Sequence, residues 1–143
     1  MSGTSTETRS VVVERDFPHP PEKLWRALTQ PHLIEEWLMR NDFAPVVGHR
    51  FNLRGDWGGV LDCEVRFVDP ERTLTYSWDF AHDDPAFNLT SVVTFSLTAT
   101  DKGTRLRMEQ SGFRPDQPQA FGGAKVGWKQ FLAKLDEVLA RID

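Results

Sequence analysis

The chain has 143 residues, and its 17 basic and 21 acidic side chains give a formal net charge of −4. This length fits one domain, and the acidic balance argues against a surface that follows nucleic-acid phosphates. No stretch approaches the ~20 consecutive apolar residues that cross a bilayer, which argues against a membrane-spanning protein.

Residues 1–10 lack the apolar segment of a secretory signal, and we predict a disordered tail there, followed by a single domain over residues 11–143. The first predicted element is a strand over residues 11–17, in which alternate side chains share one face and Arg15 lies on the same face as Phe17. Prolines end this strand. Because proline fits the first turn of a helix, Pro21 is predicted to open one short helix and Pro31 a second.

From residue 46 to residue 113 the apolar period changes to two, which is typical of strands. Polar turn segments rich in Gly, Asp and Pro separate the runs. Such clean alternation predicts an antiparallel meander that is buried on one face and wet on the other. The residues predicted to face inward are His49, Phe51, Leu53, Leu61, Cys63, Val65, Phe67, Leu74, Tyr76, Trp78, Phe80, Leu89, Ser91, Val93, Phe95, Leu97, Thr104, Leu106, Met108 and Gln110.

The C-terminal segment keeps an apolar helical stripe from Phe121 to Leu139, about five turns. A long helix of this kind is the natural partner for the buried face of the sheet. The sequence therefore predicts an α+β fold of the helix-grip type. In it, a curved six-stranded antiparallel sheet wraps around the C-terminal helix, and two short helices lie between the first two strands.

Most catalytic and metal-binding chemistries find little support. His32 and Glu36 have ligand-competent spacing, but the other histidines are scattered over separate segments, so we predict no metal and no cofactor. Cys63 is the only cysteine, so no disulfide can form within the chain, which favours a reducing cytoplasmic location. Because Cys63 lies on an apolar strand face, we expect it to be an inert, buried hydrophobic residue. No catalytic residue is predicted.

The aromatic composition is the informative feature, with ten Phe and five Trp against one Tyr. Most of these rings fall on the inward faces, where they either form a filled core or line a ligand cavity. Arg15 on such a face must meet a carboxylate, reach solvent at the sheet edge, or face a wet cavity, because an unpaired buried charge is costly. The predicted ligand-binding residues are Trp37, Phe51, Tyr76, Trp78, Phe95, Met108 and Trp128, with Arg15 and Gln110 as orienting polar groups.

Several segments, taken in order, resemble a known family over nearly the whole chain after residue 10. The segments are Arg15-Asp16-Phe17, Pro20-Pro21-Glu22-Lys23-Leu24-Trp25, Pro31-His32-Leu33-Ile34-Glu35-Glu36-Trp37, Val68-Asp69-Pro70-Glu71-Arg72-Thr73-Leu74, Ser77-Trp78, Gly103-Thr104-Arg105-Leu106, Ser111-Gly112-Phe113 and Gly127-Trp128. With them the chain resembles the Hsp90-ATPase-activator-like branch of the START/Bet v 1 (SRPBCC) superfamily of helix-grip domains.

The resemblance implies fold more strongly than function, because the superfamily includes ligand carriers, polyketide aromatases and cyclases, and a chaperone activator. We expect binding of a hydrophobic or aromatic small molecule between the sheet and the C-terminal helix. Two alternatives stay open: modulation of an Hsp90-type chaperone ATPase through protein–protein contact, and a polyketide cyclase-like or aromatase-like enzyme. The expected partner is an apolar ligand, with no nucleic acid and no membrane. A homodimer is an open alternative, with Trp57 as a candidate rim or dimer contact.

Overall fold

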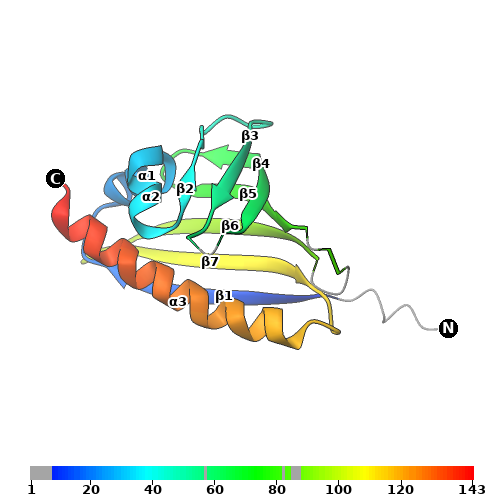
Figure 1. Cartoon of the computed structure of the whole chain (residues 1–143). Helices are drawn as coiled ribbons and strands as arrows, with labels where there is room; N and C mark the ends of the chain where they lie inside the picture. The colour runs from blue at the N-terminus through cyan, green and yellow to red at the C-terminus, as the bar shows by residue number, and fades with distance from the viewer. Residues whose placement is uncertain (1–7, 57, 82, 85–87) are drawn as a thin grey trace.

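The computed structural model describes residues 8–56, 58–81, 83–84 and 88–143, and within these ranges it contains seven strands and three helices (Figure 1). Trp57 and the first seven residues of the predicted tail lie outside the described residues, so the predictions for them are not tested. In chain order the elements are β1 (Arg9–Phe17), α1 (Pro21–Thr29), α2 (Pro31–Trp37), β2 (Arg40–Asn41), β3 (Arg50–Arg54), β4 (Val60–Asp69), β5 (Thr73–Phe80), β6 (Leu89–Thr100), β7 (Gly103–Phe113) and α3 (Pro118–Arg141).

All strands belong to one antiparallel sheet of order β1-β7-β6-β5-β4-β3-β2. The expected α+β class and helix-grip arrangement are confirmed, but the predicted count of six strands is wrong. The additional strand is β2, in which Arg40 and Asn41 pair with Arg54 and Leu53 of β3. Two residues are too short to show an alternating pattern, so the sequence gives no signal for this strand.

Both short helices begin at a proline, as predicted, since proline at the first helical position loses no backbone hydrogen bond. The two helices are tied together by the indole of Trp37, whose Nε1 donates a hydrogen bond of 2.8 Å to the carbonyl of Ala27. Trp37 is only 1% exposed, so α2 is held against the core by a side chain that is both buried and hydrogen-bonded.

Helix α3 lies across one face of the sheet, over β1 and β7 (Figure 1). Its second half is buried through Trp128, Leu132, Leu135, Val138 and Leu139, which are the core-facing residues of the predicted stripe. The first half is less buried, with Phe121 and Ala124 partly covered. Among the described residues, no helix combines the length and apolar character needed to cross a membrane.

One strand departs from the predicted alternation. The pairing of β4 with β5 shifts between Val65 and Phe67, which leaves Phe67 51% exposed, although parity predicts that it faces inward. A β-bulge adds one residue to a strand and reverses the faces of the residues beyond it. The inward assignment of Phe67 is therefore wrong, whereas Leu61, Cys63 and Val65 before the bulge are buried as expected.

Candidate functional site

A continuous series of aromatic rings runs through the interior, from β3 to α3. Phe51 meets Tyr76 with ring centroids 5.2 Å apart, and Tyr76 meets Phe95 at 5.9 Å. Phe95 then meets Trp128 of α3 at 5.8 Å. Trp128 also contacts Trp78 at 5.2 Å. Each of these side chains is less than 8% exposed, so the sheet and the helix share one aromatic interior.

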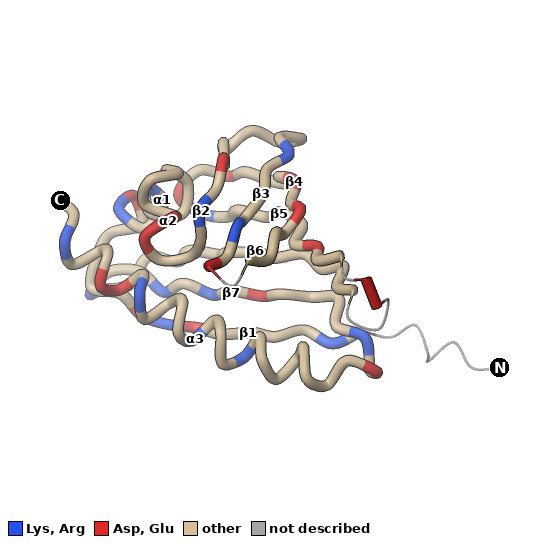
Figure 2. The backbone as a smooth tube through the Cα atoms, viewed as in Figure 1, with Lys and Arg blue, Asp and Glu red and all other residues tan. Residues whose placement is uncertain are grey.

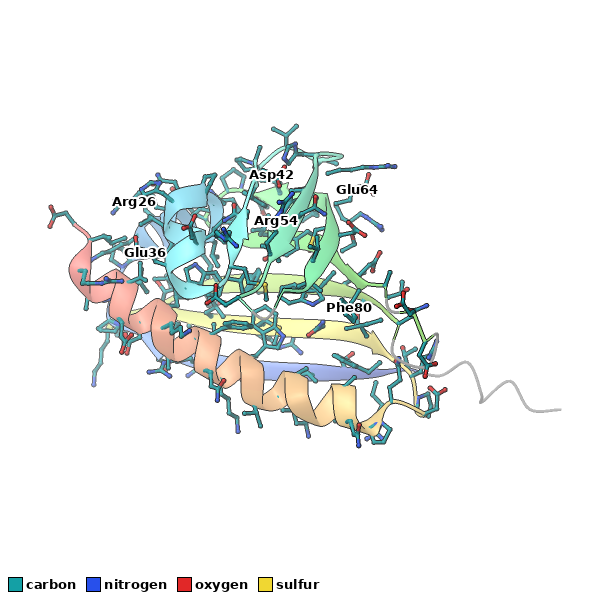
Figure 3. The ribbon with its side chains drawn as sticks, in the orientation of Figure 1. Arg26, Glu36, Asp42, Arg54, Glu64 and Phe80 are labelled. Atoms are coloured by element: carbon teal, nitrogen blue, oxygen red, sulfur yellow. The ribbon has the colours of Figure 1, made fainter. Side chains whose placement is uncertain are left out.

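Two further predicted residues lie beside this series. Trp37 contacts Phe95 edge to face at a centroid distance of 6.2 Å. Met108 is fully buried and stands opposite Phe95 in the pairing of β6 with β7. Side chains drawn in Figure 3 project from both layers into the space between the sheet and α3.

A chain of hydrogen bonds crosses the same interior. The indole Nε1 of Trp128 donates to Gln110 Oε1 at 2.7 Å, and Gln110 Nε2 donates to Ser91 Oγ at 3.0 Å. Ser91 Oγ in turn donates to the carbonyl of Trp78 at 2.6 Å. Because buried polar groups are costly without partners, this chain fixes the orientation of both tryptophans against the sheet. Gln110 is thus in the interior, as predicted, and holds α3 to β6 and β7.

Tyr76 is a further buried side chain that carries a polar group. It is 3% exposed, and its hydroxyl is not among the fully buried polar atoms that lack a partner in the described part of the chain. Burial raises the pKa of Tyr76 well above its usual value, with a smaller contribution from the neighbouring Cys63. The hydroxyl is therefore neutral at physiological pH and can donate a hydrogen bond.

Arg15 lies apart from the other predicted residues. Its guanidinium forms an ion pair of 3.1 Å with Asp136 of α3, and the two side chains are 39% and 41% exposed. Of the three alternatives that the sequence leaves open, the side chain meets a carboxylate at the boundary between β1 and α3. Its role toward a ligand stays a prediction, and the structure does not bring it together with the rings.

The structure adds one residue that sequence reasoning missed, Phe43. Phe43 is 4% exposed and contacts Phe51 at 5.1 Å and Tyr76 at 6.0 Å. It lies in an irregular segment after β2, where no periodicity marks a buried position. Phe131 of α3 packs against Trp128 at 5.5 Å, and it belongs to the helical stripe that the sequence does show.

Cys63 has none of the features of a reactive thiol. Burial, followed by the charges of Asp79, Asp62 and Asp42, raises the pKa of Cys63. The thiolate is the reactive form of cysteine, so this environment disfavours nucleophilic chemistry. Within the described ranges, no three His, Cys, Asp or Glu side chains come together in a way that could hold a metal ion.

The curved sheet, the long covering helix and the aromatic interior define a helix-grip domain of the α+β class. The family described as Activator of Hsp90 ATPase homolog 1-like protein matches residues 18–140, and the chain belongs to this family.

Solved structures show the same architecture. Protein MLL2253 from Mesorhizobium loti is 71% identical, with a TM-score of 0.92 over 94% of this chain and 99% of that one. DynU16, a putative protein in the dynemicin biosynthetic locus, is 26% identical with a TM-score of 0.80, over 92% of this chain and 47% of that one. CalU16 from Micromonospora echinospora is 25% identical with a TM-score of 0.77, over 94% of this chain and 78% of that one. A comparison with curated proteins gives no match.

Proposed function

We propose that the domain binds a hydrophobic or aromatic small molecule between the sheet and α3. The observation that carries this proposal is the aromatic interior shared by the sheet and α3, in which Phe51, Tyr76, Phe95 and Trp128 follow one another in ring contact. A ligand acceptor at the Tyr76 hydroxyl would add an orienting hydrogen bond in this apolar surrounding. Pockets for small molecules combine this chemistry, apolar walls with a few orienting polar groups.

The rings supply the affinity in this proposal, and Tyr76 supplies the orientation. Apolar burial contributes about 25 cal/mol per Å² of surface removed from water, which favours planar or aliphatic ligands over polar ones. Trp78 and Trp128 line the interior from opposite layers and give the binding event a fluorescence signal. The hydrogen-bonded Gln110 holds Trp128 in place and is not free to turn toward a ligand without breaking its existing bonds.

Tyr76 is the single tyrosine of the chain, which allows a direct test. Protein labelled with ¹³C at the tyrosine Cζ gives one signal that reports on this hydroxyl. A panel of lipids, flavonoids and aromatic polyketides is screened by thermal shift, native mass spectrometry and this signal. Binding is expected to raise the melting temperature and to move the Tyr76 signal. If no compound binds, the proposal is wrong.

The variant Tyr76→Phe is the matched control because it removes only the hydroxyl. It is expected to weaken ligands that carry an acceptor by about tenfold, which is the size of one ordinary hydrogen bond, and to leave purely apolar ligands unchanged. Equal weakening of both ligand types would contradict the orienting role. Melting temperatures of the two proteins without ligand show whether the variant stays folded.

The enzymatic alternative requires an acid or base that reaches the ligand. His49 and Arg15 do not offer such a group, because His49 bonds the carbonyl of Asp42 at the surface and Arg15 pairs with Asp136. Tyr76 is inside, but its raised pKa keeps the hydroxyl protonated, so it does not act as a base near neutral pH. We therefore rank binding above catalysis. Stimulation of an Hsp90 ATPase, which the family description suggests, is tested by adding the purified chain to that assay.

A further inference from the structure

A polar cleft of about 290 Å³ lies beside the aromatic interior, between α2, the β2–β3 end of the sheet and α3. Its lining includes Trp37 together with three cations, Arg40, Arg54 and Lys134. Figure 3 labels Glu36 on α2 and Arg54 on β3, two of the residues that line the cleft from different elements. Trp37 therefore borders the cleft while its ring contacts Phe95 in the interior.

Arg40 and Arg54 are direct partners across β2 and β3, so their side chains leave the sheet on the same side. Figure 2 shows basic segments on these two strands side by side. Like charges placed opposite each other on paired strands destabilise the pair. An arrangement of this kind is stabilised when an anion binds between the two charges.

The structure leaves this arginine pair without an internal counter-ion. Within the described residues no carboxylate is within ion-pair distance of Arg40 or Arg54, although arginines on β1, α1, β4, β7 and α3 do form such pairs. Three carboxylates line the cleft. Glu36 is already paired with Arg141 at 3.0 Å, while Glu35 and Asp56 lie beyond pairing distance of both guanidinium groups.

The chemistry of two adjacent guanidinium groups selects a planar oxyanion. Each guanidinium offers paired N–H donors that match a carboxylate in a bidentate geometry, and Lys134 adds a third positive charge at the rim. Trp37 lines the cleft and also contacts Phe95, so it is the side chain that the cleft and the rings share.

We propose that the ligand of this domain is an organic carboxylic acid, whose carboxylate binds Arg40 and Arg54 in the cleft beside Trp37. This inference rests on the proposed function, since the apolar part of the acid occupies the aromatic interior. It names the class of ligand, an aromatic or aliphatic acid, and it assigns the two arginines to its recognition.

The test uses two probes with the same ring system, 2-naphthoate and 2-naphthol, of which only the first is an anion near neutral pH. Affinities for the full chain are measured by tryptophan fluorescence, and the Tyr76 signal reports on the interior. We expect 2-naphthoate to bind at least about tenfold more tightly than 2-naphthol, because hydrogen bonds to a charged group are the stronger ones.

The double variant Arg40→Gln/Arg54→Gln is expected to remove this preference and to keep the affinity for 2-naphthol. The matched control is Arg50→Gln, which changes an arginine of the same strand β3 that lines a different surface hollow, with Asp62 and Glu64. This control is expected to retain the preference of the unmodified chain.

The outcomes separate the two proposals. Equal affinities for the two probes in the unmodified chain, or a preference that survives in the double variant, overturn the carboxylate site and leave binding at the rings supported. Binding of 2-naphthoate that shifts the backbone amides of Arg40 and Arg54 but leaves the Tyr76 signal unchanged supports the cleft and contradicts the interior site. Failure of both probes to bind overturns the carboxylate site, and the panel of lipids, flavonoids and polyketides then decides the proposed function separately.

Discussion

Gln110 is the residue on which the interior depends most directly. It accepts a hydrogen bond from Trp128 and donates one to Ser91, and it is only 2% exposed. Both of its neighbours are buried, so neither can turn to water if the amide is lost. The amide of Gln110 therefore fixes the orientation of Trp128 on α3 relative to the sheet.

The substitution Gln110→Leu keeps the size of the side chain and leaves the indole N–H of Trp128 without a partner. We expect a loss of about 1–3 kcal/mol in the free energy of unfolding, because a buried donor is left unsatisfied. Urea denaturation measures this loss. Gln119→Leu, the same change at an exposed position of α3, should stay within about 0.5 kcal/mol of the original protein. Equal effects at the two positions would argue against the network.

Cys63 gives a second prediction at this scale. Since burial raises the pKa of its thiol, the native protein should resist a disulfide exchange reagent such as dithionitrobenzoate at mildly alkaline pH. The same protein in denaturant should react with a stoichiometry of one, because it has a single cysteine. A rapid reaction of the native thiol would show that β4 opens far more readily than its pairing suggests.

At the scale of elements, two glycines illustrate opposite roles. Gly112 in β7 has a φ of +117°, and a Cβ there would lie 2.5 Å from the carbonyl oxygen of Thr90 on β6. Gly123 in α3 has open space around the same position. The first glycine is required by the close approach of two strands, whereas the second only loosens the start of a helix.

Replacing these two glycines by alanine is therefore expected to change the stability of the protein in opposite directions. Gly123→Ala should stabilise the protein by up to about 1 kcal/mol through its better helix propensity. Gly112→Ala should destabilise it by about 1–3 kcal/mol, because the backbone must leave a conformation that other residues rarely adopt. Thermal unfolding of the two variants side by side gives the comparison. Destabilisation by Gly123→Ala would show that the first half of α3 packs more tightly than its exposure indicates.

The elements also show how far the sequence alone could reach. Alternation and helical periodicity predicted the buried faces of β3, β5, β6, β7 and α3, because one side chain in two or in three to four must point inward. The bulge that turns Phe67 outward has no such signature, since it depends on how β4 pairs with β5. The partnership of Arg15 with Asp136 spans 121 positions, and parity says nothing about a contact so distant in sequence.

The candidate site was predictable to the same extent. The inward rings and Gln110 follow from strand parity, and the structure brings them together. Phe43 was not predictable, because its segment is irregular. The arginine pair at Arg40 and Arg54 depends on β2, a strand too short for any pattern, so the polar cleft could only be found in three dimensions.

At the scale of the whole molecule, the sheet is one layer and helix α3 is the second layer, which covers one face of the sheet. Five of its side chains are buried against the sheet and the two short helices, and without it this apolar face would contact water. A chain that ends at residue 117 is therefore expected to lose its near-ultraviolet circular dichroism and to bind a hydrophobic dye, as loosely packed proteins do. Retention of a cooperative unfolding transition would show that the sheet folds alone. The cytoplasmic location, the disordered tail and the homodimer stay predictions.

The order of the strands in the sheet affects how the chain can fold while it is being synthesised on the ribosome. Among the described strands β1 pairs with β7 alone, and residues 9–17 are therefore made well before residues 103–113, which form their neighbour. At about ten residues per second, translation keeps that first strand waiting for roughly ten seconds. Throughout that interval Val11 and Phe17, which are buried in the folded protein, have no partner strand and must be kept from contacts with other nascent chains.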